Sequence, residues 1–208
     1  MKQVGVFIEP KGSLAATIRA LKAKAELRLP GQKFCSHPLH STLICGRYCE
    51  PNKWRAQMGA VLARQPSFRI QTRDFHLFFE DPRADGGHTF VFKVQPTPAI
   101  FSLQQSCSDV LKLWRTRNET GENDGLIECE PFRSSFLQYG FPFVGSFWIP
   151  HFTVASLKIP RASPLLREFS SHESRHEFTL EKVSVWEIDG DSHKKLFELP
   201  LGGIIKGE

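Results

Sequence analysis

The sequence predicts an α+β fold made of two similar halves. The chain has 208 residues, of which 40% are hydrophobic and 12% aromatic, enough for one well-packed domain or for two fused halves. Segments with the apolar period of helices alternate with segments that have the two-residue period of strands. The order helix, strand, helix, strand, strand occurs twice along the chain, so a duplicated architecture is the simplest explanation.

The elements of the first half follow from apolar spacing and from the residues that begin helices. In order, we predict a strand at 4–8, a helix at 13–29, a strand at 39–46, a helix at 51–64 and strands at 67–81 and 88–95. Ser13 is the expected N-cap of the first helix, and Pro51 suits the first position of the second helix. The turn-rich stretch "PRADGG" joins the last two strands.

The second half repeats this order. In order, we predict a helix at 99–115, an exposed polar loop at 115–130, a short helix at 133–139, a strand at 151–159, a helix at 164–171 and strands at 176–189 and 194–201. The polar turn "GDS" separates the last two strands.

One strand of each half carries the same four-residue pattern. In "LHSTLICG", His40 and Thr42 interrupt a run of residues that favour a buried strand. Residues two apart in a strand point to the same face, so the imidazole and the hydroxyl share one side. The pattern His-x-Thr-hydrophobic returns 111 residues later at His151 and Thr153. One copy would fit a core histidine beside a threonine, whereas two copies favour a functional site.

These two stretches resemble the motifs of the two-histidine phosphoesterase superfamily, whose members include RNA 2',3'-cyclic phosphodiesterases and 2'-5' RNA ligase-like proteins. The resemblance implies one bilobal, duplicated domain over residues 1–208, with lobes of about 1–97 and 98–208 between which the chain is free to cross. It also implies two lobes related by a pseudo-twofold axis, with antiparallel or mixed sheets lining a central cleft and helices outside. The two motif strands would lie side by side.

The resemblance assigns catalytic roles to four residues: His40, Thr42, His151 and Thr153. The chemistry of these residue types agrees with that assignment. Cleavage of a phosphodiester needs one group that takes a proton and another that gives one, and histidine suits both roles because its ordinary pKa is about 6.5. Each threonine can donate a hydrogen bond to a phosphate oxygen. Which histidine is the acid and which is the base stays open.

We therefore predict a metal-independent phosphodiesterase that hydrolyses a cyclic phosphate or a 2'-5' phosphodiester of a nucleotide or RNA end, without a cofactor. Two alternatives stay open: a non-catalytic nucleotide- or RNA-binding module, and an RNA 2'-5' ligase. Arg47, Tyr139 and Trp148 are candidates for binding the substrate, through a phosphate contact or by stacking on a base. Phe152 should point away from His151, into the core.

A zinc site is an alternative use of the first motif. Five potential ligands fall within fifteen residues: Cys35, His37, His40, Cys45 and Cys49. Their spacings match no CxxC pair, and three of them would have to fold back from one strand, so we expect no metal.

Charge and cysteine content limit the partners and the compartment. Lysines and arginines number 27 against 22 aspartates and glutamates, and the net charge of +5 suits an anionic partner. The basic clusters are short, so duplex DNA is not an expected partner. The apolar run near the N-terminus is too short for a signal peptide or a membrane span, and five cysteines without a repeated spacing fit reduced thiols. We expect a cytoplasmic monomer.

Overall fold

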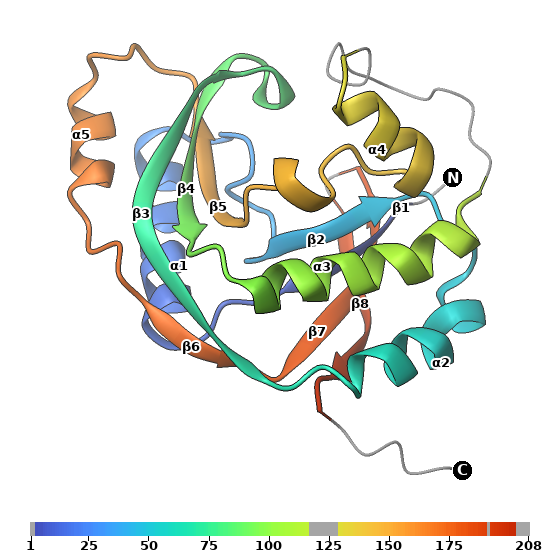
Figure 1. The fold of residues 1–208 in the computed structure, drawn as a ribbon. Helices are drawn as coiled ribbons and strands as arrows, with labels where there is room; N and C mark the ends of the chain where they lie inside the picture. Colours follow the sequence, from blue (N-terminus) through green and yellow to red (C-terminus); the bar gives the residue numbers. More distant parts are fainter. Residues whose placement is uncertain (1–2, 117–128, 191, 203–208) are drawn as a thin grey trace.

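Two four-stranded antiparallel sheets form the framework of the protein (Figure 1). The computed structural model describes residues 3–116, 129–190 and 192–202. One sheet has the strand order β2-β1-β7-β8 and the other the order β5-β4-β3-β6. The strands are β1 (Gln3–Ile8), β2 (Ser41–Gly46), β3 (Phe68–Asp81), β4 (Gly87–Val94), β5 (His151–Leu157), β6 (Glu177–Leu180), β7 (Lys182–Asp189) and β8 (Ser192–Pro200). The helices are α1 (Gly12–Arg28), α2 (Pro51–Leu62), α3 (Pro98–Leu111), α4 (Phe132–Tyr139) and α5 (Pro164–Ser170).

The two sheets meet along the strands that carry the His-x-Thr motifs. β2 and β5 each form one edge of their sheet, and the two strands contact each other. Helix α1 packs against β5 and β6, whereas α3 packs against β2 and α2 (Figure 1). Two antiparallel sheets covered by helices confirm the predicted α+β fold.

Each sheet takes strands from both halves of the chain. The units β1-α1-β2-α2 and β4-α3-β5-α5 follow the same order, apart from the short helix α4. However, β3 comes after the first unit and pairs with β4, and β7 comes after the second unit and pairs with β1. The expected division into residues 1–97 and 98–208 therefore does not separate the two sheets, because the chain crosses between them. Apolar periodicity records which face of a strand is buried, and it does not record which strand lies beside it.

The first helices lie close to their predicted positions. Four apolar residues of α1 at helical spacing are buried: Leu14, Ile18, Leu21 and Ala25. Pro51 is the first residue of α2, as expected. Ser13 is not the N-cap of α1, because the helix begins at Gly12. The Ser13 hydroxyl instead shares a hydrogen bond of 3.0 Å with Nδ1 of His176, so the side chain that was expected to cap the helix makes a tertiary contact.

The strand predicted at 176–189 is two strands in different sheets. β6 pairs with β3, and after Glu181 the chain continues as β7 between β1 and β8. Leu180 and Val183 are both buried, so the apolar pattern continues across the break and hides it.

Two predicted connections include residues outside the described part of the chain. Most of the polar loop expected at 115–130 falls on residues 117–128, and the turn expected at 190–192 includes residue 191. Within the part of the chain that is described, no helix has the length and apolar character needed to cross a membrane.

Candidate active site

Both motif strands contain a β-bulge at the same position. Thr42 pairs with Phe7 and Ile44 pairs with Val6, which leaves Leu43 as an extra residue. In the second sheet, Thr153 pairs with Val91 and Ala155 with Phe90, so Val154 is the extra residue. The hydrophobic residue that ends each His-x-Thr-hydrophobic motif is therefore the bulged one.

The bulge shifts the alternation of side chains by one position. Leu43 and Ile44 are both fully buried, and so are Val154 and Ala155. Cys45, three residues after Thr42, takes a place in the lining of the cleft. The adjacent apolar pair in each motif strand is the sequence signal of this irregularity.

The two histidines are held in the same way. Nδ1 of His40 lies 2.8 Å from the carbonyl oxygen of Pro38, and Nδ1 of His151 lies 2.6 Å from that of Ile149. A carbonyl only accepts hydrogen bonds, so each Nδ1 carries the proton and donates it to the carbonyl two residues earlier. This leaves Nε2 of each ring available to a bound molecule. The motif residues His40, Thr42, His151 and Thr153 all line one cleft of about 1140 Å³.

Burial favours the neutral form of both imidazoles in the free protein. It lowers the pKa of His40 to about 4, although the hydrogen bond to the Pro38 carbonyl opposes this effect. Burial also lowers the pKa of His151, against the opposing effect of the Ile149 carbonyl. A bound anion would favour the charged form of both rings, because a nearby negative charge stabilises an imidazolium.

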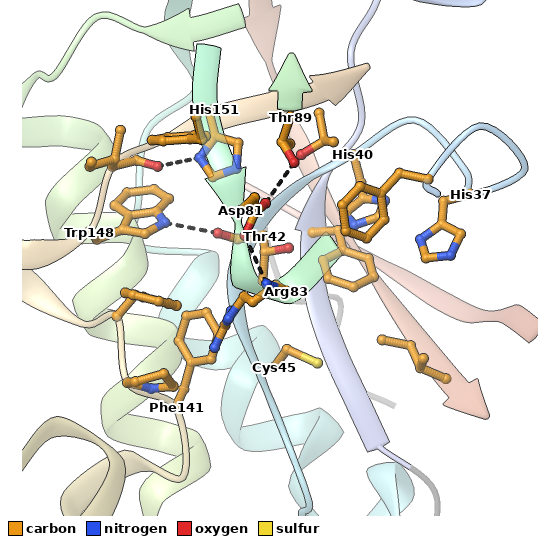
Figure 2. Close-up of a pocket in the computed structure, with 18 of the residues that line it drawn as sticks. His37, His40, Thr42, Cys45, Asp81, Arg83, Thr89, Phe141, Trp148 and His151 are labelled. Carbon is orange, nitrogen blue, oxygen red and sulfur yellow. Dashed lines mark hydrogen bonds between the residues drawn. The ribbon is translucent and has the colours of Figure 1, made fainter. Parts of the chain in front are cut away.

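The tip of the β3–β4 hairpin lines the cleft with three charged residues, Asp81, Arg83 and Asp85, of which Figure 2 labels the first two. The carboxylate of Asp81 accepts hydrogen bonds from the backbone N–H of Arg83 at 3.0 Å and from the hydroxyl of Thr89 at 2.6 Å. The Arg83 guanidinium lies 4.6 Å from the ring centre of Phe143, on the opposite wall. Sequence reasoning missed these charges, because Asp81 was interpreted as the end of a strand and Arg83 and Asp85 as part of the turn "PRADGG".

A comparison with protein families identifies the superfamily of the chain. A family model of the 2'-5' RNA ligase superfamily matches residues 10–192. The chain belongs to this superfamily. The match confirms the resemblance to two-histidine phosphoesterases that the His-x-Thr motifs indicated. No curated protein matches the chain significantly.

Solved structures share the fold of this superfamily member at low sequence identity. TT0787 of Thermus thermophilus is 18% identical, with a TM-score of 0.57 over 98% of this chain and 99% of that one. E. coli LigT complexed with 3'-AMP is 11% identical, with a TM-score of 0.55 over 97% of this chain and 99% of LigT. LigT complexed with NADP+ is 14% identical, with a TM-score of 0.53 over 97% and 98%.

Two of the three candidate substrate-binding residues line the cleft. Arg47 and Trp148 line the cleft of this superfamily member, and Tyr139 does not. Trp148 is only 5% exposed, and its indole N–H donates a hydrogen bond of 3.0 Å to the carbonyl oxygen of Thr42. It therefore supports the first motif strand (Figure 2). The hydroxyl of Tyr139 accepts a hydrogen bond from Gln105 at 3.1 Å, on the side of α3.

An aromatic wall closes one end of the cleft. It consists of α4 and the segment after it, and its members are Phe132, Phe136, Phe141, Phe143 and Phe147. Several of these rings meet edge to face at centroid distances of 5.5–6.2 Å. Such a wall can bury and stack a planar apolar group. The sequence signal is the aromatic-rich run "GFPFVGSFW", in which only the tryptophan was expected to bind substrate.

The alternative zinc ligands do not form a cluster. Among the described residues, no three histidine, cysteine, aspartate or glutamate side chains are arranged to hold a metal ion. All five cysteines are free thiols. Burial raises the pKa of Cys45 to about 12, so its thiol stays protonated at neutral pH. Phe152 is fully buried and lies on the face opposite to His151, as expected.

Proposed function

We propose that the protein is a metal-independent phosphodiesterase that hydrolyses a cyclic phosphate or a 2'-5' phosphodiester of a nucleotide or RNA end. The observation that carries this proposal is the pair of equivalently anchored imidazoles. Each donates through Nδ1 to the carbonyl two residues before it, and each shares one cleft with the threonine that follows. One ring can remove a proton while the other supplies one.

The reaction needs no group beyond the substrate, water and these side chains. A new bond forms between the water oxygen and phosphorus, and the water proton passes to Nε2 of one histidine. The bond between phosphorus and the leaving oxygen breaks, and that oxygen takes the proton from Nε2 of the other histidine. Thr42 and Thr153 donate hydrogen bonds to the non-bridging oxygens, where negative charge is concentrated.

The rest of the cleft supports a nucleotide as the substrate. The aromatic wall provides planar apolar surface for a base, and stacking contributes roughly 1–3 kcal/mol per base. Arg47 and Arg83 line the same cleft and supply positive charge for phosphate groups. E. coli LigT, which shares the fold, is crystallised with 3'-AMP, ATP and NADP+.

We expect the protein to work as a cytoplasmic monomer. Both His-x-Thr motifs that line the cleft come from one chain, so the site needs no second copy. Five free thiols fit a reducing compartment.

The proposal is tested by turnover with identified products. Purified protein is incubated, with and without a strong chelator, with 2',3'-cyclic nucleotides, 2'-5' dinucleotides and cleaved RNA halves, and the products are identified by mass. Hydrolysis of one of the first two classes, unchanged by the chelator, is the expected result. Joined RNA halves would favour the ligase alternative, which the superfamily name suggests. Binding without turnover would favour a non-catalytic module, and activity lost to the chelator and restored by zinc would favour a metal site.

The threonines are expected to matter less than the histidines. Thr42→Val and Thr153→Val each remove one donor to the phosphate but leave proton transfer in place, so we expect a loss of about 10- to 100-fold in kcat. Thr42→Ser and Thr153→Ser keep the hydroxyl and should recover most of the activity. Steady-state kinetics on the substrate found above would measure both effects. Valine variants with wild-type kcat would contradict the proposed phosphate contacts.

A further inference from the structure

We propose that the two histidines are fixed in opposite roles, with His40 as the general base and His151 as the general acid, because charges of opposite sign are built in beside them. We call this division of roles the polarity of the site. Lys22 favours the neutral form of His40 and Asp81 favours the charged form of His151, so both are positioning residues that act through a histidine. The inference rests on the proposed function and adds the direction in which protons move through the site.

A buried lysine stands on the His40 side. Lys22, on α1, is 8% exposed and also lines the cleft. Its ammonium group donates hydrogen bonds to three successive parts of one loop, at the carbonyls of Phe34, Cys35 and His37. The next residue after His37 is Pro38, whose carbonyl holds the His40 ring. Burial lowers the pKa of Lys22 to about 8, so the ammonium is positively charged at neutral pH and below, where the acid limb of a pH profile lies. The loop that it organises leads directly into the first motif.

The other ionisable neighbours of His40 are histidines, which carry no negative charge in either protonation state. The rings of His37 and His193 lie 4.5 Å apart, and His193 lies 6.1 Å from His40. Phe7 stacks on His40 at 4.2 Å and contributes no charge. After burial, the groups that lower the pKa of His40 are His193, His37 and Lys22, and no carboxylate is among the causes. His40 therefore tends to stay neutral, which is the state that a general base needs.

A carboxylate stands on the His151 side. Asp81 is held by the Thr89 hydroxyl, and this hydroxyl also lies 3.0 Å from the hydroxyl of Ser156 on the second motif strand. The carboxylate is thus fastened to the sheet that carries His151, and Figure 2 shows it between His151 and Thr42.

Ionisable groups with opposite effects on the pKa surround His151, and the Asp81 carboxylate has the largest effect among them. After burial and the Ile149 carbonyl, Asp81 raises the pKa of His151, whereas His76 and Arg83 lower it. Phe78 meets the His151 ring edge to face at 5.7 Å and carries no charge. Relative to His40, His151 is the ring on which a proton is better stabilised. A phosphate bound between the rings favours both charged forms and leaves this difference in place.

The polarity defines the direction of the reaction. His40 Nε2 accepts the proton of the attacking water as its oxygen bonds to phosphorus. His151 Nε2 gives its proton to the leaving oxygen as that bond breaks. The histidines then return to their starting states by exchanging protons with solvent.

Neutralising Asp81 gives the decisive test. In a profile of kcat against pH, the acid limb reports protonation of the base and the alkaline limb reports loss of the acid's proton. Asp81→Asn removes a negative charge near His151, so the alkaline limb should move to lower pH by on the order of half a pH unit, with the acid limb unmoved. Glu80→Gln is the matched control, because Glu80 pairs with Arg161 at 2.9 Å and does not line the cleft. It should leave both limbs in place.

Lys22 gives the complementary test. Lys22→Met removes a positive charge near His40, so the acid limb should move to higher pH. Lys24→Met, on the same helix, removes a lysine that pairs with Glu168 and should move neither limb. Lys22→Met also leaves three carbonyls without their donor; if it does not fold, Asp81→Asn decides the question alone.

The outcomes separate this inference from the proposed function. If Asp81→Asn moves the acid limb, the roles of the two histidines are reversed. If it moves neither limb, Asp81 does not set the polarity. Either result overturns the inference. NMR titration of the histidine rings in the free protein needs no substrate, and there Asp81→Asn should lower the pKa of His151 and leave that of His40 in place. Wild-type protein that cleaves no phosphodiester would end the proposed function, while this titration would still test the charge difference.

Discussion

Replacing either His40 or His151 by alanine is expected to lower turnover by about 10²–10⁴-fold, the usual range for removing a general acid or base. Both side chains keep some exposure at the cleft, so the fold should survive each substitution. Kinetics on the substrate identified by product analysis would measure the loss, and thermal unfolding would confirm that the variants are folded.

A matched control comes from a histidine away from the cleft. His172 is exposed and does not line the cleft, so His172→Ala should keep wild-type activity. Near-native turnover in either motif variant would end the two-histidine account. Equal losses of turnover in the histidine and threonine variants, together with aggregation, would instead mean that the motif residues stabilise the core and have no catalytic role.

Replacing Gln104 by methionine is expected to lower the free energy of unfolding by about 3 kcal/mol, because it leaves one buried and two partly buried backbone groups without their partners. Gln104, on α3, is fully buried. Its amide nitrogen donates to the carbonyl of the bulge residue Leu43 at 3.0 Å and to that of Phe143 at 2.8 Å. Its amide oxygen accepts from the N–H of Gly145 at 3.0 Å. One side chain thus joins the first motif strand to the aromatic wall.

The neighbouring glutamine provides the control. Gln105 is partly exposed, and its amide donates to the hydroxyl of Tyr139, so Gln105→Met should cost less than about 1 kcal/mol. Denaturant unfolding would measure both variants. A Gln104→Met protein as stable as Gln105→Met would show that these hydrogen bonds do not hold the first motif strand and the aromatic wall together.

Local sequence predicted the elements where a regular period reports burial. The apolar face of α1 and the inward direction of Phe152 follow from the spacing of residues along a helix and a strand. The same reasoning fails at the motif strands. A two-residue period puts Ile44 beside Thr42, yet the bulge sends Ile44 into the core and brings Cys45 to the cleft. A bulge depends on pairing with the next strand, and periodicity carries no record of that pairing.

The partners of the strands were likewise beyond the sequence. β6 and β7 continue one apolar pattern, and only their pairing with β3 and with β1 shows that they belong to different sheets. Tyr139 has the residue type for stacking, but its position on α4 turns it toward α3 and away from the cleft.

The sequence by itself determined the four motif residues, their shared face and therefore the kind of chemistry that they can perform. The tertiary structure decided what stands beside each histidine. Lys22 reaches the site from α1, and Asp81 reaches it from the tip of a hairpin. Electrostatic effects depend on distance in space and on burial, and neither can be counted along the chain. Two nearly identical motifs can therefore hold their protons differently, and only the folded chain distinguishes them.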